Sequence, residues 1–179
     1  MPDIQVGDKT FVPFIGKEKI QQRIKEIAAD INTVYEGKKP LLIGILNGSF
    51  IFAADLFREL TIDAEISFIK LASYKGTSST GHVITAIGME EDLSGRHVII
   101  VEDIIDTGTT LHAFLPEIHH RQAASVKIAS FLTKPSALKY DVRADFFGFE
   151  IENKFVVGYG LDYNGYGRNY PELYVLKGQ

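Results

Sequence analysis

The sequence has 179 residues, 45% of them hydrophobic and 23% charged, which is the composition of a globular protein with enough apolar side chains for one core. Its formal net charge of −4 gives no general attraction to nucleic acid or to a membrane surface, so we expect neither as a partner. Because cysteine is absent, disulfides, thiol nucleophiles and cysteine-ligated metals are excluded.

The N-terminal third predicts a helix, a strand and a second helix. Residues 1–11 contain no basic segment followed by an apolar one, so we expect no signal peptide and a cytoplasmic location. Apolar residues at helical spacing predict an amphipathic helix over about residues 17–35. The run LLIGIL at 41–46 predicts a buried strand, and helical spacing predicts a helix over 50–60.

The turn Asn47-Gly48-Ser49 separates this strand from this helix. Asn-Gly is also a strong hairpin signal, but the helical spacing that follows argues against a hairpin. A strand, a glycine turn and a helix together can bind an anion through free backbone N–H groups. The same residues could equally be a simple connection without a ligand.

The middle of the chain predicts two strands joined by a polar segment. The strands are expected at 64–71 and 82–89. Between them, residues 73–81 contain two glycines and five Ser or Thr side chains, a composition that cannot build a core. This segment is either a surface connection or a lid that excludes water from a site.

Residues 97–111, HVIIVEDIIDTGTTL, carry the strongest functional signal in the sequence. Residues 97–101 predict a buried strand, followed by an acidic turn with Glu102 and Asp103. The segment 106–110, DTGTT, precedes a helical pattern and fits a phosphate at a helix N-terminus. Adjacent carboxylates suit vicinal hydroxyls or Mg2+, so the segment predicts a sugar-phosphate site. Without a ligand it would be a strand, an acidic turn and a capped helix.

The last third of the chain adds two strands and a glycine-rich segment. SVKIASFLT at 125–133 and LYVL at 173–176 predict strands. A lysine at a strand end, such as Lys134, is generally a solvated surface residue. Gly158-x-Gly160 lacks the third glycine of a dinucleotide-binding turn. Because strands alternate with helices, we expect one domain over 1–179, with an α/β fold and a mostly parallel central sheet flanked by helices.

Four separated motifs together resemble the hypoxanthine-guanine branch of the type I phosphoribosyltransferase family. The motifs are the 97–111 segment, Ser73-Tyr74, Lys134, and the stretch from Phe155 to Asp162. The resemblance implies the type I fold with a small hood formed by the chain ends, and a homodimer or homotetramer. The implied reaction is transfer of a phosphoribosyl group from 5-phosphoribosyl-1-pyrophosphate (PRPP) to hypoxanthine or guanine, with Mg2+ as cofactor.

The resemblance also implies a role for individual residues. Asp106 would be the catalytic base, and Ser73 and Tyr74 would belong to a lid. The residues expected at the ribose and its 5′-phosphate are Glu102, Asp103, Asp106, Thr107, Gly108, Thr109 and Thr110. Those expected at pyrophosphate are Leu46, Asn47, Gly48 and Arg168; those at the purine are Lys134, Phe155 and Val156; those at Mg2+ are Asp162, Glu102 and Asp103. Members of the family usually carry lysine where this chain has Asn47.

Two alternatives remain open at this stage. Some proteins with this fold regulate transcription by binding nucleic acid, and such a protein should present a basic face. The 19 Lys and Arg residues are spread along this acidic chain, which argues against a regulator. The second alternative is a related transferase that prefers xanthine and guanine, because preference among 6-oxopurines depends on the shape of the pocket.

Overall fold

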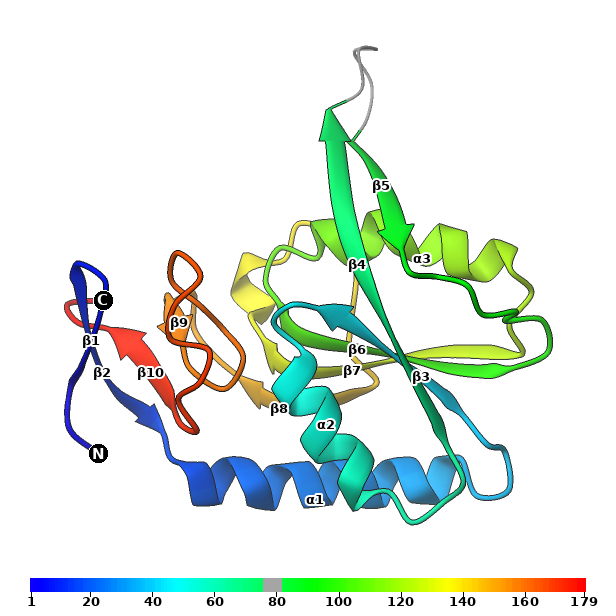
Figure 1. Cartoon of the computed structure of the whole chain (residues 1–179), viewed down its shortest axis with the longest axis horizontal. Helices are drawn as coiled ribbons and strands as arrows, with labels where there is room; N and C mark the ends of the chain where they lie inside the picture. The colour runs from blue at the N-terminus through cyan, green and yellow to red at the C-terminus, as the bar shows by residue number, and fades with distance from the viewer. Residues whose placement is uncertain (76–81) are drawn as a thin grey trace.

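A six-stranded sheet forms the centre of the protein (Figure 1). The computed structural model describes the backbone of residues 1–75 and 82–179 and the side chains of residues 1–71 and 87–179. The strands are β3 (Leu41–Leu46), β4 (Glu65–Lys75), β5 (His82–Ile87), β6 (His97–Ile105), β7 (Ser125–Thr133) and β8 (Phe146–Glu150). Their order is β5-β4-β3-β6-β7-β8, and all but β5 are parallel. The mostly parallel sheet expected from the sequence is confirmed.

Helices cover both faces of this sheet. Side chains alternate along a strand, so β6 sends Ile99 to a cluster with α1 (Lys17–Val34) and α2 (Phe50–Glu59). It sends Val98 and Ile100 to a second cluster with α3 (Thr109–His120) on the other face. Both faces are buried, which explains why β3 and β6 are continuous apolar runs in the sequence. Among the described residues, no helix combines the length and apolarity needed to cross a bilayer.

The two ends of the chain form a separate antiparallel sheet at one side of the molecule (Figure 1). Its strands are β1 (Ile4–Val6), β2 (Lys9–Ile15), β9 (Val156–Val157) and β10 (Leu173–Leu176), in the order β1-β2-β10-β9. This sheet, called the hood below, has its own apolar cluster around Phe11 and Val157. The hood expected from the chain ends is therefore present.

The structure corrects the sequence prediction at the end of β6 and in several strands that the sequence did not predict. Strand β6 continues to Ile105, so Glu102 and Asp103 lie inside the strand and not in a turn after it. The continuation is possible because the backbone still pairs with β7, with Glu102 opposite Ser130, whatever the charge of the side chains. Strands β1, β2, β8 and β9 were not predicted. Strand β8 lies so close to β7 that a Cβ at Gly148 would be 2.3 Å from the Phe131 carbonyl oxygen.

Candidate active site

The predicted phosphate loop joins β6 to α3. Gly108 precedes the helix with a φ of 76°, a left-handed conformation that glycine adopts without strain. The helix begins at Thr109, and the hydroxyl oxygens of Thr107 and Thr109 are 2.9 Å apart. Glu102 and residues Ile104 to Leu111 line a small cavity of about 80 Å³. The loop, with Thr110 exposed beside it, thus has the backbone geometry of an anion site at a helix N-terminus.

The two acids of β6 lie in a strongly desolvated position. Burial raises the pKa of Glu102 well above its usual range, and the adjacent Asp103 carboxylate raises it further. Burial also raises the pKa of Asp103, although the Ile104 N–H, which donates to its Oδ1 at 2.8 Å, opposes this. Oε2 of Glu102 is buried and has no hydrogen-bond partner within the described part of the chain. The charge of Arg168 lowers the pKa of Asp103, but the unpartnered oxygen of Glu102 leaves this pair of carboxylates chemically suited to a hard cation.

The turn after β3 packs directly against these acids. A Cβ added at Gly48 would be 1.4 Å from Oδ2 of Asp103. A Cβ added at Gly160 would be 2.1 Å from the backbone oxygen of Gly48. Gly48 is therefore held between the strand acids and the segment that follows the hood strand β9. Leu46 is half-buried at the end of β3, the Leu46–Asn47 peptide bond is cis, and the Asn47 side chain is exposed.

Lys134 lies at the end of β7, where its backbone N–H donates to the Ile105 oxygen at 2.9 Å. The sequence alone favoured a solvated surface lysine, and this is wrong because Lys134 is only 6% exposed. Its Nζ donates to Oδ2 of Asp106 at 3.1 Å. A buried ammonium needs a partner, and the side chain of Asp106, itself 47% exposed, supplies it.

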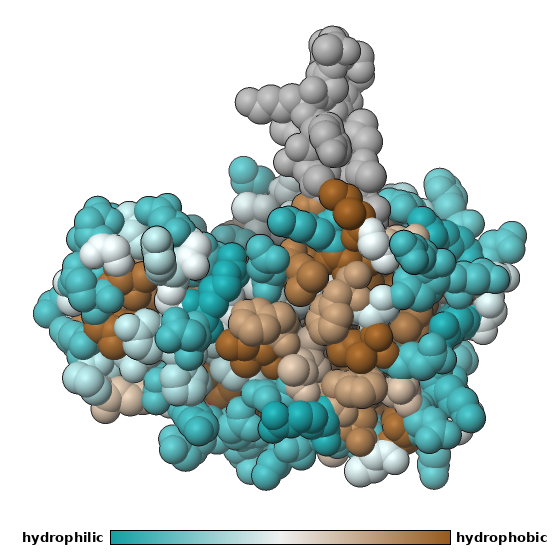
Figure 2. Space-filling view, viewed as in Figure 1, coloured by the Kyte–Doolittle hydropathy of each residue, from teal (hydrophilic) through white to brown (hydrophobic). Residues whose placement is uncertain are grey.

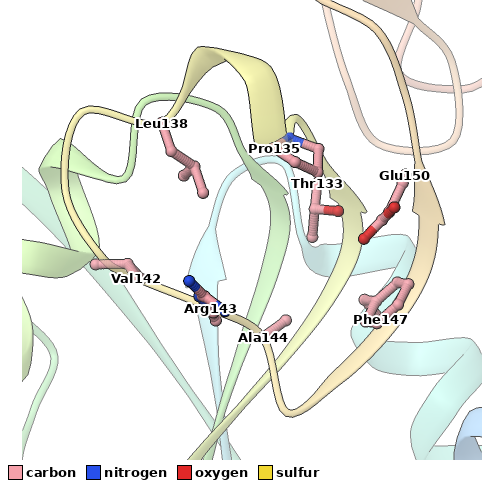
Figure 3. A pocket seen from close by; sticks show the side chains of 8 residues that line it. All are labelled: Thr133, Pro135, Leu138, Val142, Arg143, Ala144, Phe147 and Glu150. Atoms are coloured by element: carbon pink, nitrogen blue, oxygen red, sulfur yellow. The ribbon is translucent and has the colours of Figure 1, made fainter.

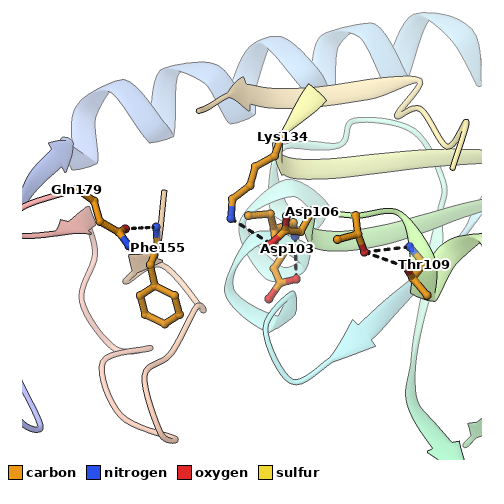
Figure 4. Close-up of polar contacts among 8 residues, drawn as sticks. Asp103, Asp106, Thr109, Lys134, Phe155 and Gln179 are labelled. Atoms are coloured by element: carbon orange, nitrogen blue, oxygen red, sulfur yellow. Dashed lines mark hydrogen bonds and ion pairs between the residues drawn. The ribbon is translucent and has the colours of Figure 1, made fainter. Parts of the chain in front are cut away.

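Phe155 faces this pair from the hood (Figure 4). Its ring is 41% exposed, and its N–H donates to the Gln179 side chain at 2.8 Å. The ring of Phe155 also packs beside Phe11 and Tyr163, with ring centroids 6.2 Å and 5.9 Å apart, and its exposed part borders the pocket between the hood and the sheet. The next residue, Val156, is buried in β9.

A pocket of about 220 Å³ separates the hood from the sheet. Eight residues line it: Asp103, Ile104, Asp106, Lys134, Phe155, Val156, Leu161 and Asp162. The pocket shares Ile104 and Asp106 with the phosphate-loop cavity, so the two cavities adjoin. Together they offer a carboxylate, an ammonium group and an aromatic ring beside an anion site.

Asp162 and Arg168 pair with each other at the edge of this pocket. Arg168 Nη2 lies 2.7 Å from Oδ1 of Asp162, and the Gly165 N–H donates to Oδ2 at 2.6 Å. Arg168 Nη1 also donates to the Gly160 oxygen at 2.7 Å. Both side chains are partly buried. Arg168 is therefore held in an ion pair with a residue that lines the pocket.

A cavity of about 390 Å³ lies on another side of the loop that contains Lys134 (Figure 3). Apolar residues such as Leu138, Val142 and Phe147 line much of it, and Arg143 and Glu150 lie at its border. None of the carboxylates or hydroxyls predicted from the sequence lines this cavity. We therefore assign the candidate site to the smaller pocket, where these groups converge.

The lid prediction falls mostly outside the described residues. The backbone of Ser73 and Tyr74 belongs to β4, but their side chains and residues 76–81 lie outside the described part. Sequence analysis missed Leu161 and Ile104 as pocket residues, and it missed the hydrogen bond from Tyr159 to Asp55 behind the pocket. No local pattern distinguishes these residues from ordinary core positions.

Comparisons with known proteins point to one family. A family model described as a phosphoribosyl transferase domain matches residues 16–164. The hypoxanthine-guanine phosphoribosyltransferase of Bacillus subtilis (strain 168) is 42% identical over 164 residues, which are 91% of each chain. The hypoxanthine-guanine-xanthine phosphoribosyltransferase of Tritrichomonas foetus is 40% identical over 163 residues, 90% of this chain and 89% of that relative.

A solved structure agrees with these sequence relatives. The crystal structure of a hypoxanthine-guanine phosphoribosyltransferase from Bacillus anthracis superposes with a TM-score of 0.84 at 36% identity. The match covers 92% of this chain and 96% of that one. The similarity therefore extends over most of the chain.

Proposed function

The chain belongs to the hypoxanthine-guanine phosphoribosyltransferase family, and we propose that it transfers the 5-phosphoribosyl group from PRPP to hypoxanthine and guanine. The products are IMP or GMP and pyrophosphate, so the enzyme serves purine salvage. The family resemblance seen in the sequence is confirmed by the identity and coverage of the relatives. The arrangement that carries the proposal is the pocket in which Lys134 and Asp106 face Phe155 beside the phosphate loop (Figure 4).

Residues from the sheet and the hood would bind the purine between them. The exposed ring of Phe155 offers a stacking surface, with the Val156 backbone beside it. Lys134 only donates hydrogen bonds, so it favours a 6-oxo substituent over a 6-amino one. Asp106 lies 3.1 Å from Lys134 and would accept the proton that the purine releases, near N7.

Residues of β6 and its loop would hold PRPP. Thr107, Gly108, Thr109 and Thr110 would bind the 5′-phosphate through backbone N–H groups and hydroxyls. Glu102 and Asp103 would bind the ribose hydroxyls. As the bond from C1 to the pyrophosphate oxygen breaks and the purine nitrogen bonds to C1, positive charge develops on the ribose, and these carboxylates favour that charge.

Glu102 and Asp103 also fit Mg2+, since a buried carboxylate oxygen of Glu102 lacks a partner in the described chain and Mg2+ binds through one or two carboxylates plus substrate oxygens. When bound, Mg2+ would neutralise charge on the leaving pyrophosphate. Asp162 is the third proposed ligand. Its partner Arg168 would turn to the pyrophosphate, next to Leu46, Asn47 and Gly48.

Three further expectations belong to this proposal. Ser73 and Tyr74 would form a lid that protects PRPP from hydrolysis. A cytoplasmic location agrees with the absence of cysteine.

A homodimer or homotetramer would cover the apolar side chains that gather over α2 and β4, where Phe50 and Phe68 are exposed (Figure 2). Light scattering measures the mass, and a monomeric wild type would contradict this last expectation.

The function is tested by a spectrophotometric assay with PRPP and Mg2+ and four bases in parallel. Turnover of hypoxanthine and guanine but not adenine is expected, because Lys134 donates to a 6-oxo group. Preferential turnover of xanthine would keep the reaction and change the subfamily, toward the activity named for the Tritrichomonas foetus relative. A protein that binds PRPP tightly but turns over no base would contradict the proposed enzyme and favour a regulator.

A further inference from the structure

Tyr159 links the hood to the core at a point directly behind the proposed pyrophosphate site. It lies in a tight turn in which Gly158 and Leu161 exchange two backbone hydrogen bonds of 3.0 Å. Its φ of 48° is left-handed, which is unusual for a residue with a large side chain. Such a conformation persists only where the surrounding contacts hold it.

The Tyr159 side chain contacts two elements of the core, and a third element binds the same partner. Its ring is 2% exposed and packs against Phe131 of β7, with ring centroids 4.7 Å apart. Its hydroxyl donates to Oδ2 of Asp55 on α2 at 2.6 Å. Gln21 of α1 donates to the same oxygen at 3.0 Å. The Tyr159 side chain thus fixes the hood turn against β7 and α2, and Gln21 ties α1 to the same carboxylate.

The residue after Tyr159 transmits this position to the site. Gly160 lies so close to the turn after β3 that a Cβ there would be 2.1 Å from the Gly48 oxygen. Its own oxygen accepts the 2.7 Å hydrogen bond from Arg168. Gly48 and Arg168, two of the groups proposed to bind pyrophosphate, therefore both contact Gly160.

We infer that Tyr159, held by Asp55, is a positioning residue that sets the spacing between the Gly48 turn and Arg168 and so determines the affinity for the pyrophosphate group. This inference rests on the proposed function. Tyr159 lines a cavity behind the site together with Asp55 and Arg58, and it is absent from the residues that line the candidate pocket. It acts through Gly160 and contacts no substrate.

The test is Tyr159→Phe, which keeps the ring against Phe131 and removes only the hydrogen bond to Asp55. A hydrogen bond to a carboxylate is stronger than a neutral one, and we expect the KM for PRPP and the Kd for pyrophosphate to rise by about tenfold. The KM for hypoxanthine should stay within about twofold. A merely structural role would lower the active fraction, and hence the maximal rate, without this difference between the two substrates.

Tyr174→Phe is the matched control. Tyr174 is also a buried hood tyrosine, 4% exposed, but its hydroxyl contacts Glu172 within the hood at 3.3 Å. Its removal should leave both KM values unchanged. Asp55→Ala should reproduce the effect of Tyr159→Phe, and the double variant should be no worse than either single one.

The outcomes separate this inference from the proposed function. An active wild type with an unchanged PRPP KM in Tyr159→Phe would contradict the inference alone. The same conclusion follows if Tyr174→Phe raises the PRPP KM equally, or if the effects of Tyr159→Phe and Asp55→Ala simply add. A wild type that neither turns over PRPP nor binds pyrophosphate would contradict the proposed function.

Discussion

Gly48→Ala is the change whose effect the structure defines most sharply. The added Cβ would be 1.4 Å from Oδ2 and 2.4 Å from Cγ of Asp103, far inside van der Waals contact. The turn cannot simply retreat, because the Gly48 oxygen already lies against Gly160 on its other side. The Asp103 side chain must therefore rotate away from its observed position.

The rotation removes a defined interaction. Oδ1 of Asp103 accepts the Ile104 N–H at 2.8 Å, and a hydrogen bond to a charged group is worth about 1.5–3 kcal/mol. An off-rotamer side chain would cost about 0.5–1.5 kcal/mol. If this free energy, about 2–4.5 kcal/mol together, is lost from the proposed ribose site, kcat/KM for PRPP falls by about 30- to 2,000-fold.

Initial rates of IMP formation at varied PRPP measure this loss. Gly16→Ala is the control, since a Cβ at Gly16 meets its nearest atom, the Met1 sulfur, at an ordinary 3.5 Å. We expect Gly16→Ala to keep wild-type kinetics. If Gly48→Ala kept kcat/KM within about threefold of the wild type, the tight packing between Gly48 and Asp103 would have no role in binding PRPP.

Three further changes test other parts of the site. Asp106→Asn should lower kcat by about 10²–10⁴-fold, because the amide cannot accept the purine proton. The KM for PRPP should change little, and unchanged turnover would exclude Asp106 as the base. Lys134→Met should raise the KM for hypoxanthine by about 10- to 150-fold and reduce the preference of the enzyme for hypoxanthine over adenine. An unchanged ratio of kcat/KM for these two bases would contradict the role of Lys134. Glu102→Gln in EDTA should raise Tm at neutral pH, since burial raises the pKa of Glu102 and penalises its charged form. The difference in Tm between Glu102→Gln and the wild type should shrink as the pH falls through the raised pKa, where the wild-type carboxyl becomes protonated. A Tm difference that does not depend on pH would refute a raised pKa for Glu102.

The sequence by itself determined most of the central sheet, without β8, and one half of the site. Strands buried on both faces leave continuous apolar runs, and the predicted bounds of β3, β7 and β10 agree with the structure. Parallel strands end at the same edge of a sheet, so their order in the chain already implies that the residues after β3, β6 and β7 lie near one another. The phosphate loop was recognisable because its glycine, its hydroxyls and its helix start are adjacent in the chain.

Only the tertiary structure decided how the hood completes the site. Tyr159 and Asp55 are 104 positions apart in the sequence, and neither stands in a pattern that indicates a contact. The burial of Lys134 was mispredicted for the same reason: its partner Asp106 is 28 positions away. Local periodicity reports which face of an element is apolar, whereas the burial of a polar side chain depends on partners that folding brings from elsewhere in the chain.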